Sequence, residues 1–279
     1  ADLAMPTFIA GLDIGTHTIK AAVAEIRRDG RISLRKIARG PSAGMRRGVI
    51  HDLGETIRAC AAVTSELKLD YPHALKFLYL AHGGEDAATH PSRGIVAVSR
   101  ADSEIHRDDI ERAIEASQAI KLPRNRTVIH SLIQEYIVDE AQHITDPTGM
   151  MGNRLEVRSL IIEGFTPAFK DVIRCAEVCG GGVREVMFSP LSASRAALSK
   201  AQRELGVCLI DIGAGTCGIA VYDEGKLVHT AILPMGSGHV TNDLAIGLQT
   251  TPEAAEHIKR TLGLALAREA PARETVELR

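Results

Sequence analysis

The stretch DIGTHTIKAAV at residues 13–23 returns as DIGAGTCGIAV at residues 211–221, with six of the eleven positions identical. Each copy follows an apolar run, turns at a glycine, and continues as a second β-like run that ends in an acidic residue followed by glycine, which is a hairpin signal. A third strand and a helix are expected after each hairpin. The expected elements are residues 8–12, 18–26, 31–38 and 51–67 in the first copy and 207–210, 216–222, 226–233 and 240–248 in the second.

One supersecondary unit used twice predicts a two-lobed α/β protein. If the two units face each other, their aspartate-containing turns lie across a single cleft. A lone Asp-Ile-Gly tripeptide carries little information, and duplication by itself can be purely structural. The recurrence of the tripeptide in the same strand–turn–strand context favours a functional pair.

The glycine turns suit phosphate groups, because glycine lets the backbone approach a ligand closely and successive N–H groups can surround an anion. The hydroxyl groups of Thr16 and Thr216 can add donors. The residues predicted to bind phosphate are Gly15, Thr16, His17, Lys20, Gly213, Ala214, Gly215 and Thr216. Two of these residues have an alternative to phosphate binding. Lys20 can be an exposed strand lysine, and His17 can point to solvent.

Asp13 and Asp211 are predicted at the strand ends just before the two turns. A carboxylate cannot contact phosphate directly without repulsion, but it can act through Mg²⁺, which keeps several water ligands and prefers phosphate oxygens. The sequence therefore predicts an Mg²⁺ ion held through water by Asp13 and Asp211.

Composition excludes several other functions. The 279 residues carry a net charge of −2 and contain 3% aromatic residues without tryptophan, which argues against a nucleic-acid-binding surface. The sequence has neither a long apolar run nor a signal-peptide pattern. The five cysteines show no metal-binding spacing, so Cys175 and Cys179 are expected to be small buried residues. Arg27-Arg28 and Arg46-Arg47 are expected on the solvated surface.

The duplicated motifs resemble those of the actin, heat-shock-chaperone and sugar-kinase superfamily, and several further stretches are similar to the bacterial cell-division family FtsA. The stretches that carry this second resemblance are residues 44–48, 134–139, 146–150, 154–157, 241–245 and 256–260. The resemblance covers essentially the whole chain. It implies an actin-like ATPase fold with two ribonuclease-H-like lobes and an inserted small α+β subdomain.

The domain boundaries implied are residues 1–81 plus 160–204 for the first lobe, 82–159 for the insertion and 205–279 for the start of the second lobe. Within the insertion, residues 94–99 and 127–138 are expected to be strands and residues 102–120 a helix. The second lobe is expected to be incomplete, which implies a fragment or a naturally short relative. Residues 265–279 are expected to form a frayed tail.

The resemblance also implies an adenosine site and ATP with Mg²⁺ as ligands. Its residues would be Gly236, Gly238, Glu256, Lys259 and Arg260. The last three share one helix face, which can equally be a solvated charged surface. The FtsA family usually has lysine where Thr18 stands, and the efficient ATPases of the superfamily have an acid or amide where Ser189 stands. Weak or negligible hydrolysis is therefore expected, since serine orients water poorly.

The function implied is an ATP-binding scaffold that forms filaments with itself, links FtsZ filaments to the inner face of the cytoplasmic membrane and recruits later division membrane proteins. Membrane attachment would need a C-terminal helix that this sequence does not contain. No nucleic-acid partner is expected. Two alternatives share the fold: a pilus-assembly protein like PilM, and a sugar or acetate kinase, for which no paired catalytic acid and sugar-binding cluster was found.

Overall fold

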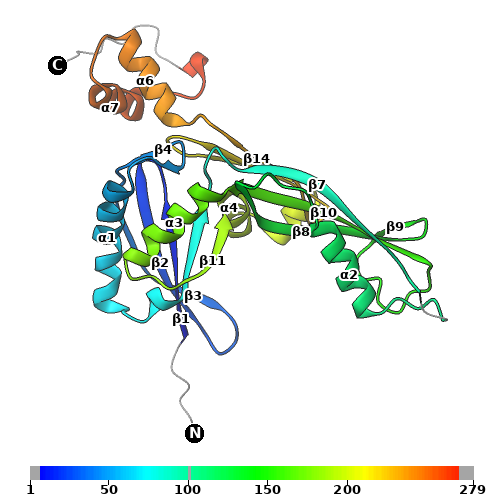
Figure 1. The fold of residues 1–279 in the computed structure, drawn as a ribbon. Coiled ribbons are helices and arrows are strands. Elements are labelled where there is room, and N and C mark those ends of the chain that lie inside the picture. Colours follow the sequence, from blue (N-terminus) through cyan, green and yellow to red (C-terminus); the bar gives the residue numbers. More distant parts are fainter. Residues whose placement is uncertain (1–6, 100–101, 270–279) are drawn as a thin grey trace.

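A computed structural model describes residues 7–99 and 102–269 of the chain. Its first lobe is built on a five-stranded sheet in the order β11-β6-β1-β2-β3 (Figure 1). The strands are β1 (Thr7–Ile14), β2 (Thr18–Ile26), β3 (Ile32–Pro41), β6 (Leu78–His82) and β11 (Val183–Phe188). Strands β1, β2 and β3 are antiparallel neighbours, whereas β6 lies parallel to β1 and β11 parallel to β6. The predicted strand–turn–strand–turn–strand unit is confirmed for the first copy.

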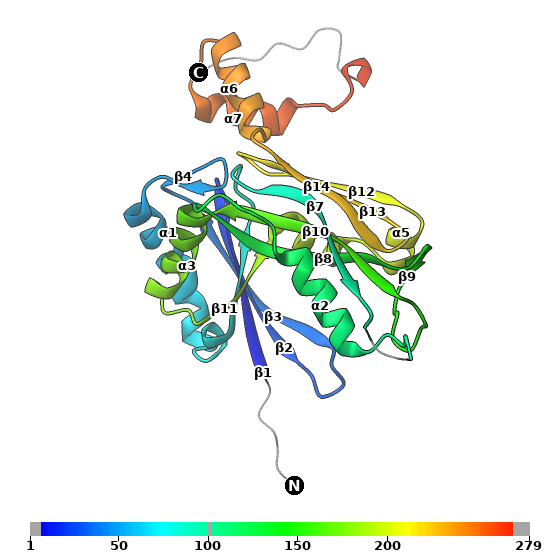
Figure 2. The same ribbon diagram turned by 45° about the vertical axis from the view of Figure 1, so that its right-hand side comes forward.

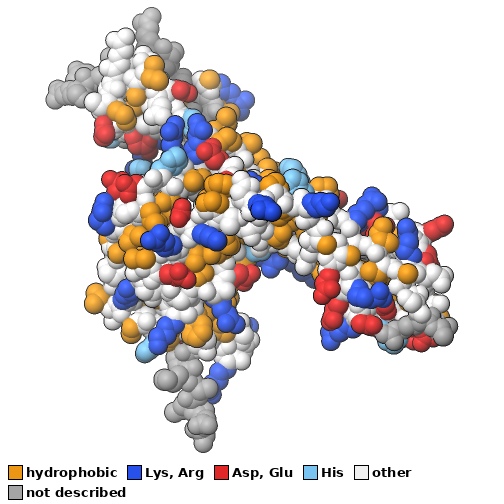
Figure 3. Space-filling view, viewed as in Figure 1, with side chains coloured by type: hydrophobic (Ala, Val, Ile, Leu, Met, Phe, Trp, Pro, Cys, Tyr) orange, Lys and Arg blue, Asp and Glu red, His pale blue; other side chains and the backbone are white. Residues whose placement is uncertain are grey.

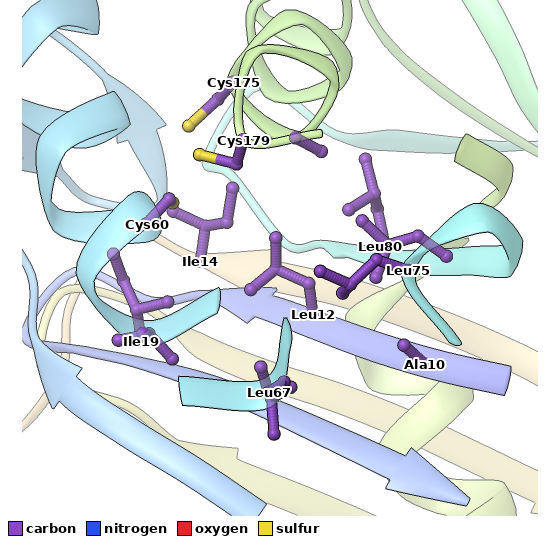
Figure 4. Close-up of a cluster of buried hydrophobic side chains, with 14 of the residues drawn as sticks. Ala10, Leu12, Ile14, Ile19, Cys60, Leu67, Leu75, Leu80, Cys175 and Cys179 are labelled. Atoms are coloured by element: carbon purple, nitrogen blue, oxygen red, sulfur yellow. The ribbon is translucent and has the colours of Figure 1, made fainter. Parts of the chain in front are cut away.

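One face of this sheet is covered by α1 (Leu53–Asp70) and α3 (Thr166–Val178) (Figures 1 and 4). The Asp52 side chain caps α1 by accepting a 2.8 Å hydrogen bond from the Glu55 N–H. Alternate residues of β1, Leu12 and Ile14, are buried beneath the two helices. Burying each such side chain contributes about 1.5–3 kcal/mol. This strand pattern fixes which face of β1 looks into the core.

Cysteines line the contact between α1 and α3. Cys60 of α1, Cys175 of α3 and Cys179, the residue that follows α3, are buried in the same core as Ile14 (Figure 4). The prediction that Cys175 and Cys179 are buried small residues is confirmed. Mutual hydrogen bonds with the other two thiols, together with burial, raise the pKa of Cys60, so this thiol stays protonated.

The inserted unit extends from the first lobe as a four-stranded sheet in the order β7-β10-β8-β9, with α2 on one face (Figure 1). Its elements are β7 (Ala88–Ala97), α2 (Arg107–Gln118), β8 (Arg126–Val138), β9 (Ala141–Ile144) and β10 (Arg154–Phe165). The expected helix over 102–120 is too long at its start. Residues before α2 are held extended, because Glu104 forms a β-bridge with Met151 and Ile105 N–H donates to the Met150 carbonyl.

The first strand of the insertion begins earlier than residue 94, since β7 pairs with β10 as far as Ala88 opposite Glu163. One proposed domain border, at residues 159/160, falls within β10. The division of the chain into a first lobe, an insertion and a second lobe at the stated boundaries stays a prediction.

The second copy of the unit forms a three-stranded sheet in the order β12-β13-β14. It comprises β12 (Val207–Ile212), β13 (Cys217–Asp223), β14 (Lys226–Leu233) and α6 (Ser237–Gly247), followed by α7 (Pro252–Leu262). Helix α6 begins three residues before the expected start. The short helices α4 (Ser189–Ala197) and α5 (Lys200–Glu204) connect the lobes. Helices α6 and α7 pack on each other and stand above the β4–β5 hairpin (Met45–Arg46 and Val49–Ile50) in both ribbon views (Figure 2).

The second sheet lies against the insertion as well as against the first lobe. The Thr89 hydroxyl donates to the Thr230 carbonyl at 3.1 Å, and the Gln134 amide donates to the Leu227 carbonyl at 2.8 Å. A shared apolar cluster joins all three parts. It contains Leu160 and Ile162 of β10, Phe188 and Leu191, and Ala220, Tyr222 and Leu227. The Tyr222 hydroxyl also hydrogen-bonds Ser194 of α4 at 2.8 Å within this core. This packing fixes the second sheet, and with it the turn after β12, relative to the first lobe.

Candidate functional site

The two glycine turns have the same construction. A Cβ atom on Gly15 would lie 2.7 Å from the Thr18 carbonyl oxygen, and one on Gly213 would lie 3.1 Å from the Thr216 carbonyl oxygen. In the second turn the Gly213 N–H donates to that carbonyl at 2.9 Å. Glycine is required because the chain folds back on itself within three residues. The duplicated sequence thus produces a duplicated turn.

The turns meet at the cleft between the lobes. A Cβ atom on Gly215 would lie 2.7 Å from the Thr16 hydroxyl oxygen and 3.0 Å from Arg47 Cα, so the two backbones approach closely here. A cavity of about 280 Å³ lies between them. Its lining includes every residue predicted to bind phosphate or Mg²⁺: Asp13, Gly15, Thr16, His17, Lys20, Asp211, Gly213, Ala214, Gly215 and Thr216.

Asp13, near the end of β1, and Asp211, near the end of β12, both line this cavity. Burial raises the pKa of Asp13, the ammonium group of Lys20 lowers it, and the charge of Asp211 raises it again, so the net shift is upward from 3.8. Because the charge of Asp211 disfavours ionisation of Asp13, a cation bound by both carboxylates would favour it. The donor set is all oxygen and leaves room for water, which fits Mg²⁺.

Lys20 is the cross-strand partner of Asp13 in the β1–β2 pair. Its Nζ atom lies 3.4 Å from Asp13 Oδ2, and its side chain is 61% exposed. The residue aligned with it in the second copy is Gly218, which pairs with Asp211. Only the first turn therefore brings a cation to the carboxylate, and a phosphate group bound there would compete for it.

A second cavity, of about 630 Å³, continues from the first toward α6 and α7. Thr16, His17, Ala214, Gly215 and Ser237 line both cavities, so the two cavities adjoin at these residues. His17 is exposed at this junction.

The residues predicted to bind adenosine divide into two groups. Gly238, Glu256 and Lys259 line the second cavity, whereas Gly236 and Arg260 do not. Arg260 is exposed on the flank of α7. Gly236 lies beneath the second turn, where a Cβ atom would meet the Ala214 backbone at 2.8 Å. Gly236 therefore permits the turn to pack on the start of α6.

Helices α6 and α7 are joined by a polar network at the edge of this cavity. The Lys259 ammonium group lies 2.5 Å from the Glu256 carboxylate and donates to the Thr241 hydroxyl at 2.8 Å and the Ser237 carbonyl at 3.2 Å. Hydrogen bonds from Lys259 and Thr241 lower the pKa of Glu256, so its carboxylate is ionised. The spacing predicted a shared face for Glu256 and Lys259, and this face contacts α6 as well as the cavity.

Sequence reasoning missed two parts of the cavity walls. Arg46 and Arg47, expected on the solvated surface, line the second cavity. His82, at the end of β6, lines the first cavity although its side chain is only 1% exposed. Its Nε2 atom lies 3.5 Å from Asp86 Oδ1, too far for a normal hydrogen bond. A polar residue that ends a buried apolar strand was the available signal for His82.

A twice-used strand–turn–strand unit with its two aspartate-containing turns across one cleft defines the actin-like ATPase fold. Two solved structures share it. One is a chain of a PilM–PilN type IV pilus biogenesis complex (TM-score 0.64, 17% identity, covering 91% of this chain and 69% of that one). The other is the ethanolamine utilization protein EutJ of Carboxydothermus hydrogenoformans (TM-score 0.52, 18% identity, 92% and 62%). At these identities the likeness concerns the fold alone.

Within this class, the chain belongs to the FtsA family of cell-division proteins. Residues 84–163 match the SHS2 domain inserted in FtsA, and residues 208–279 match cell division protein FtsA. The chain is 34% identical over 97% of its length to FtsA of Pseudomonas aeruginosa, 35% over 96% to that of Bacillus subtilis and 32% over 97% to that of Escherichia coli. It spans 64%, 60% and 64% of the length of these relatives. Within the described residues, no helix is both long and apolar enough to cross a membrane.

Proposed function

We propose that this chain binds ATP with Mg²⁺ in the crevice between its lobes and acts as a cell-division scaffold of the actin-like type. The single observation that carries the proposal is that Asp13 and Asp211, from the two copies of the repeat, line one cavity together with both glycine turns. The N–H groups of the turns and the Lys20 ammonium group would bind the phosphates. The two carboxylates would hold Mg²⁺ through water, and Mg²⁺ would neutralise part of the phosphate charge.

The adenosine part of the ligand would occupy the second cavity, beside Gly238, Glu256 and Lys259. Gly236 and Arg260 would act only indirectly, Gly236 by letting the second turn pack on α6. Hydrolysis is expected to be weak. Asp13 and Asp211 are the only acids among the described residues that line the first cavity, and Ser189 stands where an efficient enzyme would orient water. ATP would then serve chiefly as a conformational ligand.

As a scaffold, the protein would assemble with itself, link FtsZ filaments to the inner face of the cytoplasmic membrane and recruit later division proteins. Membership of the FtsA family supports this role over pilus assembly or sugar phosphorylation. The insertion projects away from the cleft and offers surface for such contacts (Figure 1). Capture of the chain by an immobilised FtsZ C-terminal peptide, compared with a scrambled peptide, would test the partnership.

Nucleotide binding is tested by calorimetric titration of ATP with and without Mg²⁺. Wild type should bind more tightly with Mg²⁺, and Asp13→Ala and Asp211→Ala should each weaken Mg²⁺-dependent binding by at least about tenfold. Asp243→Asn is the matched control, because Asp243 is exposed on α6 and lines neither cavity. Binding that is indifferent to both alanine substitutions would remove the site assignment.

A further inference from the structure

The tip of the β4–β5 hairpin forms one wall of the second cavity. Arg46 and Arg47 line this cavity with Thr16 and His17, opposite the residues of α6 and α7. In both ribbon views β4 lies directly below these two helices (Figures 1 and 2). Basic, histidine and acidic side chains all lie around the constriction beneath them (Figure 3). The wall opposite the adenosine-side residues is therefore cationic.

The hairpin tip is held rigidly. Arg47 and Gly48 both have positive φ angles, 48° and 74°, as a tight two-residue hairpin requires. The Gly48 N–H donates to the Thr16 hydroxyl at 2.9 Å, which ties the tip to the first glycine turn. The Arg47 carbonyl accepts from the Glu85 N–H at 3.2 Å. The tip therefore presents its side chains from a fixed position beside the first turn.

Arg46 differs from the other cations of the two cavities in having no acidic partner. Lys20 pairs with Asp13, Lys259 pairs with Glu256, and the Arg47 guanidinium lies 3.4 Å from Glu85. Arg46 forms no ion pair with any other described residue, and its side chain is exposed at the cavity. A guanidinium group without an ion-pair partner can bind an anion without first breaking an existing ion pair.

The first N–H groups of α6 are not free to bind a phosphate group. The N–H groups of Ser237 and Gly238 already donate to the carbonyls of Gly213 and Ala214, at 2.8 and 2.9 Å. A helix N-terminus whose first N–H groups are engaged has fewer donors left for a phosphate group. The phosphate chain, which must pass the residues shared by both cavities, would need a donor from the facing wall.

We infer that Arg46 is a third phosphate-binding element of the site, which binds the phosphate chain of the nucleotide from the first lobe. The inference rests on the proposed nucleotide site. Guanidinium groups bind phosphate oxygens through paired, charge-assisted hydrogen bonds. Arg47 has a different task, since its contacts with Glu85 fix the hairpin. The ligand class is a phosphorylated nucleoside, recognised at this point by charge and not by its base.

The test compares the affinities of ATP, ADP and adenosine for wild type, Arg46→Ala and Arg46→Lys. Arg46→Ala should weaken ATP and ADP by roughly 10- to 100-fold and leave adenosine within about twofold. Arg46→Lys should restore part of the loss, and ATP binding by Arg46→Ala should depend less on salt. Arg39→Ala is the control, because this exposed arginine of β3 lines neither cavity.

Equal losses for adenosine and ATP would overturn the inference, since Arg46 would then act on the base or on the fold. Unchanged ATP affinity in Arg46→Ala would overturn it as well, while leaving the proposed function intact. If wild type bound none of the three ligands, the proposed function itself would fail. Arg46 is exposed, so its replacement is expected to leave the thermal unfolding midpoint unchanged, which circular dichroism can verify.

Discussion

Among single residues, Gly215 lies where the second glycine turn closely approaches the first lobe. Its neighbours across the cleft are the Thr16 side chain and the backbone of Arg47. A methyl group added at Gly215 has no free space, so one of these neighbours must move.

Gly215→Ala is therefore expected to separate the turns, to weaken ATP binding by about tenfold and to lower the free energy of unfolding by about 1–3 kcal/mol. Gly11→Ala is the control, because a Cβ atom there would meet only the Tyr79 carbonyl oxygen, at 4.0 Å. Equal behaviour of the two variants in titration and thermal unfolding would show that the turns do not need their close contact.

His130 gives a prediction of pH dependence. Its Nε2 atom accepts a 3.0 Å hydrogen bond from the Phe188 N–H, which requires that nitrogen to be unprotonated. Burial lowers the pKa of His130 below 6.5, Glu185 raises it and Arg195 lowers it further. Because the folded pKa is depressed, the contribution of His130 to stability is complete above pH 6.5 and is lost as the pH falls through the lowered pKa.

Urea unfolding at successive pH values should show this loss in wild type and a flatter profile in His130→Gln, which keeps an acceptor without titrating. His257→Gln, on the exposed face of α7, serves as the control. A slope that persists in His130→Gln would assign the titration to another group.

Much of the site could be predicted residue by residue, because phosphate and Mg²⁺ chemistry constrain the few residues around each turn. The missed residues lacked such a local signal. From its sequence context Arg46 was expected on the surface, and only the position of the hairpin places it at the cavity. His82 lies at the end of an apolar strand, which does not by itself predict a cavity residue. Gly236 and Arg260 have neighbours in sequence that line the second cavity but do not line it themselves, and helix spacing alone does not decide this.

At the scale of elements, the contact between α2 and β7 depends on Gly94. A Cβ atom on Gly94 would collide with the Ala113 carbonyl and lie 2.5 Å from the Ser117 nitrogen, both in the backbone of α2. The helix packs this closely because the strand has no side chain at that position.

Gly94→Ala should push α2 off the sheet and lower the free energy of unfolding by about 1–3 kcal/mol or more. Gly247→Ala, at the end of α6 with no atom within 4 Å of the added group, should be neutral or slightly stabilising. Denaturant unfolding of both variants measures the difference. A Gly94→Ala variant as stable as wild type would mean that α2 can shift without cost.

The order of the three strands and the helix within each copy of the repeat was predictable, since hydrophobic alternation and hairpin signals are local. The residues at which the elements begin and end were not predictable in this way. Helix α2 starts late because residues 103–105 pair with residues 149–152 before β10. Strand β7 starts early because β10 offers it a partner as far as Glu163. Such limits depend on partners that are distant in sequence.

For the whole molecule, the two sheets are unequal. Strand β1 has β2 on one side and β6 on the other, whereas β12 has only β13 among the described residues. Leu12 of β1 and Ile210 of β12 occupy the same position in the two copies of the repeat. Leu12 is 2% exposed, whereas Ile210 is 59% exposed. An open strand edge with exposed apolar side chains tends to pair with another chain.

The isolated chain is thus expected to self-associate through β12 at micromolar concentration, and Ile210→Lys should shift it toward the monomer. Sedimentation velocity measures the change. Leu205→Lys, at an 86% exposed position outside the strands, is the control. Identical sedimentation of wild type and Ile210→Lys would exclude this edge as the contact.

The engagement of α6 by the second turn has a consequence beyond the cleft. Ser237 and Gly238 bind the turn, and Lys259 binds Ser237, so the turn, α6 and α7 are joined in series. We therefore expect a ligand that displaces the turn to displace both helices with it. A protein that docks on the outer side of α7 would then change the affinity of the chain for the ligand. By linkage, the ligand would change the affinity of the chain for that protein by the same factor.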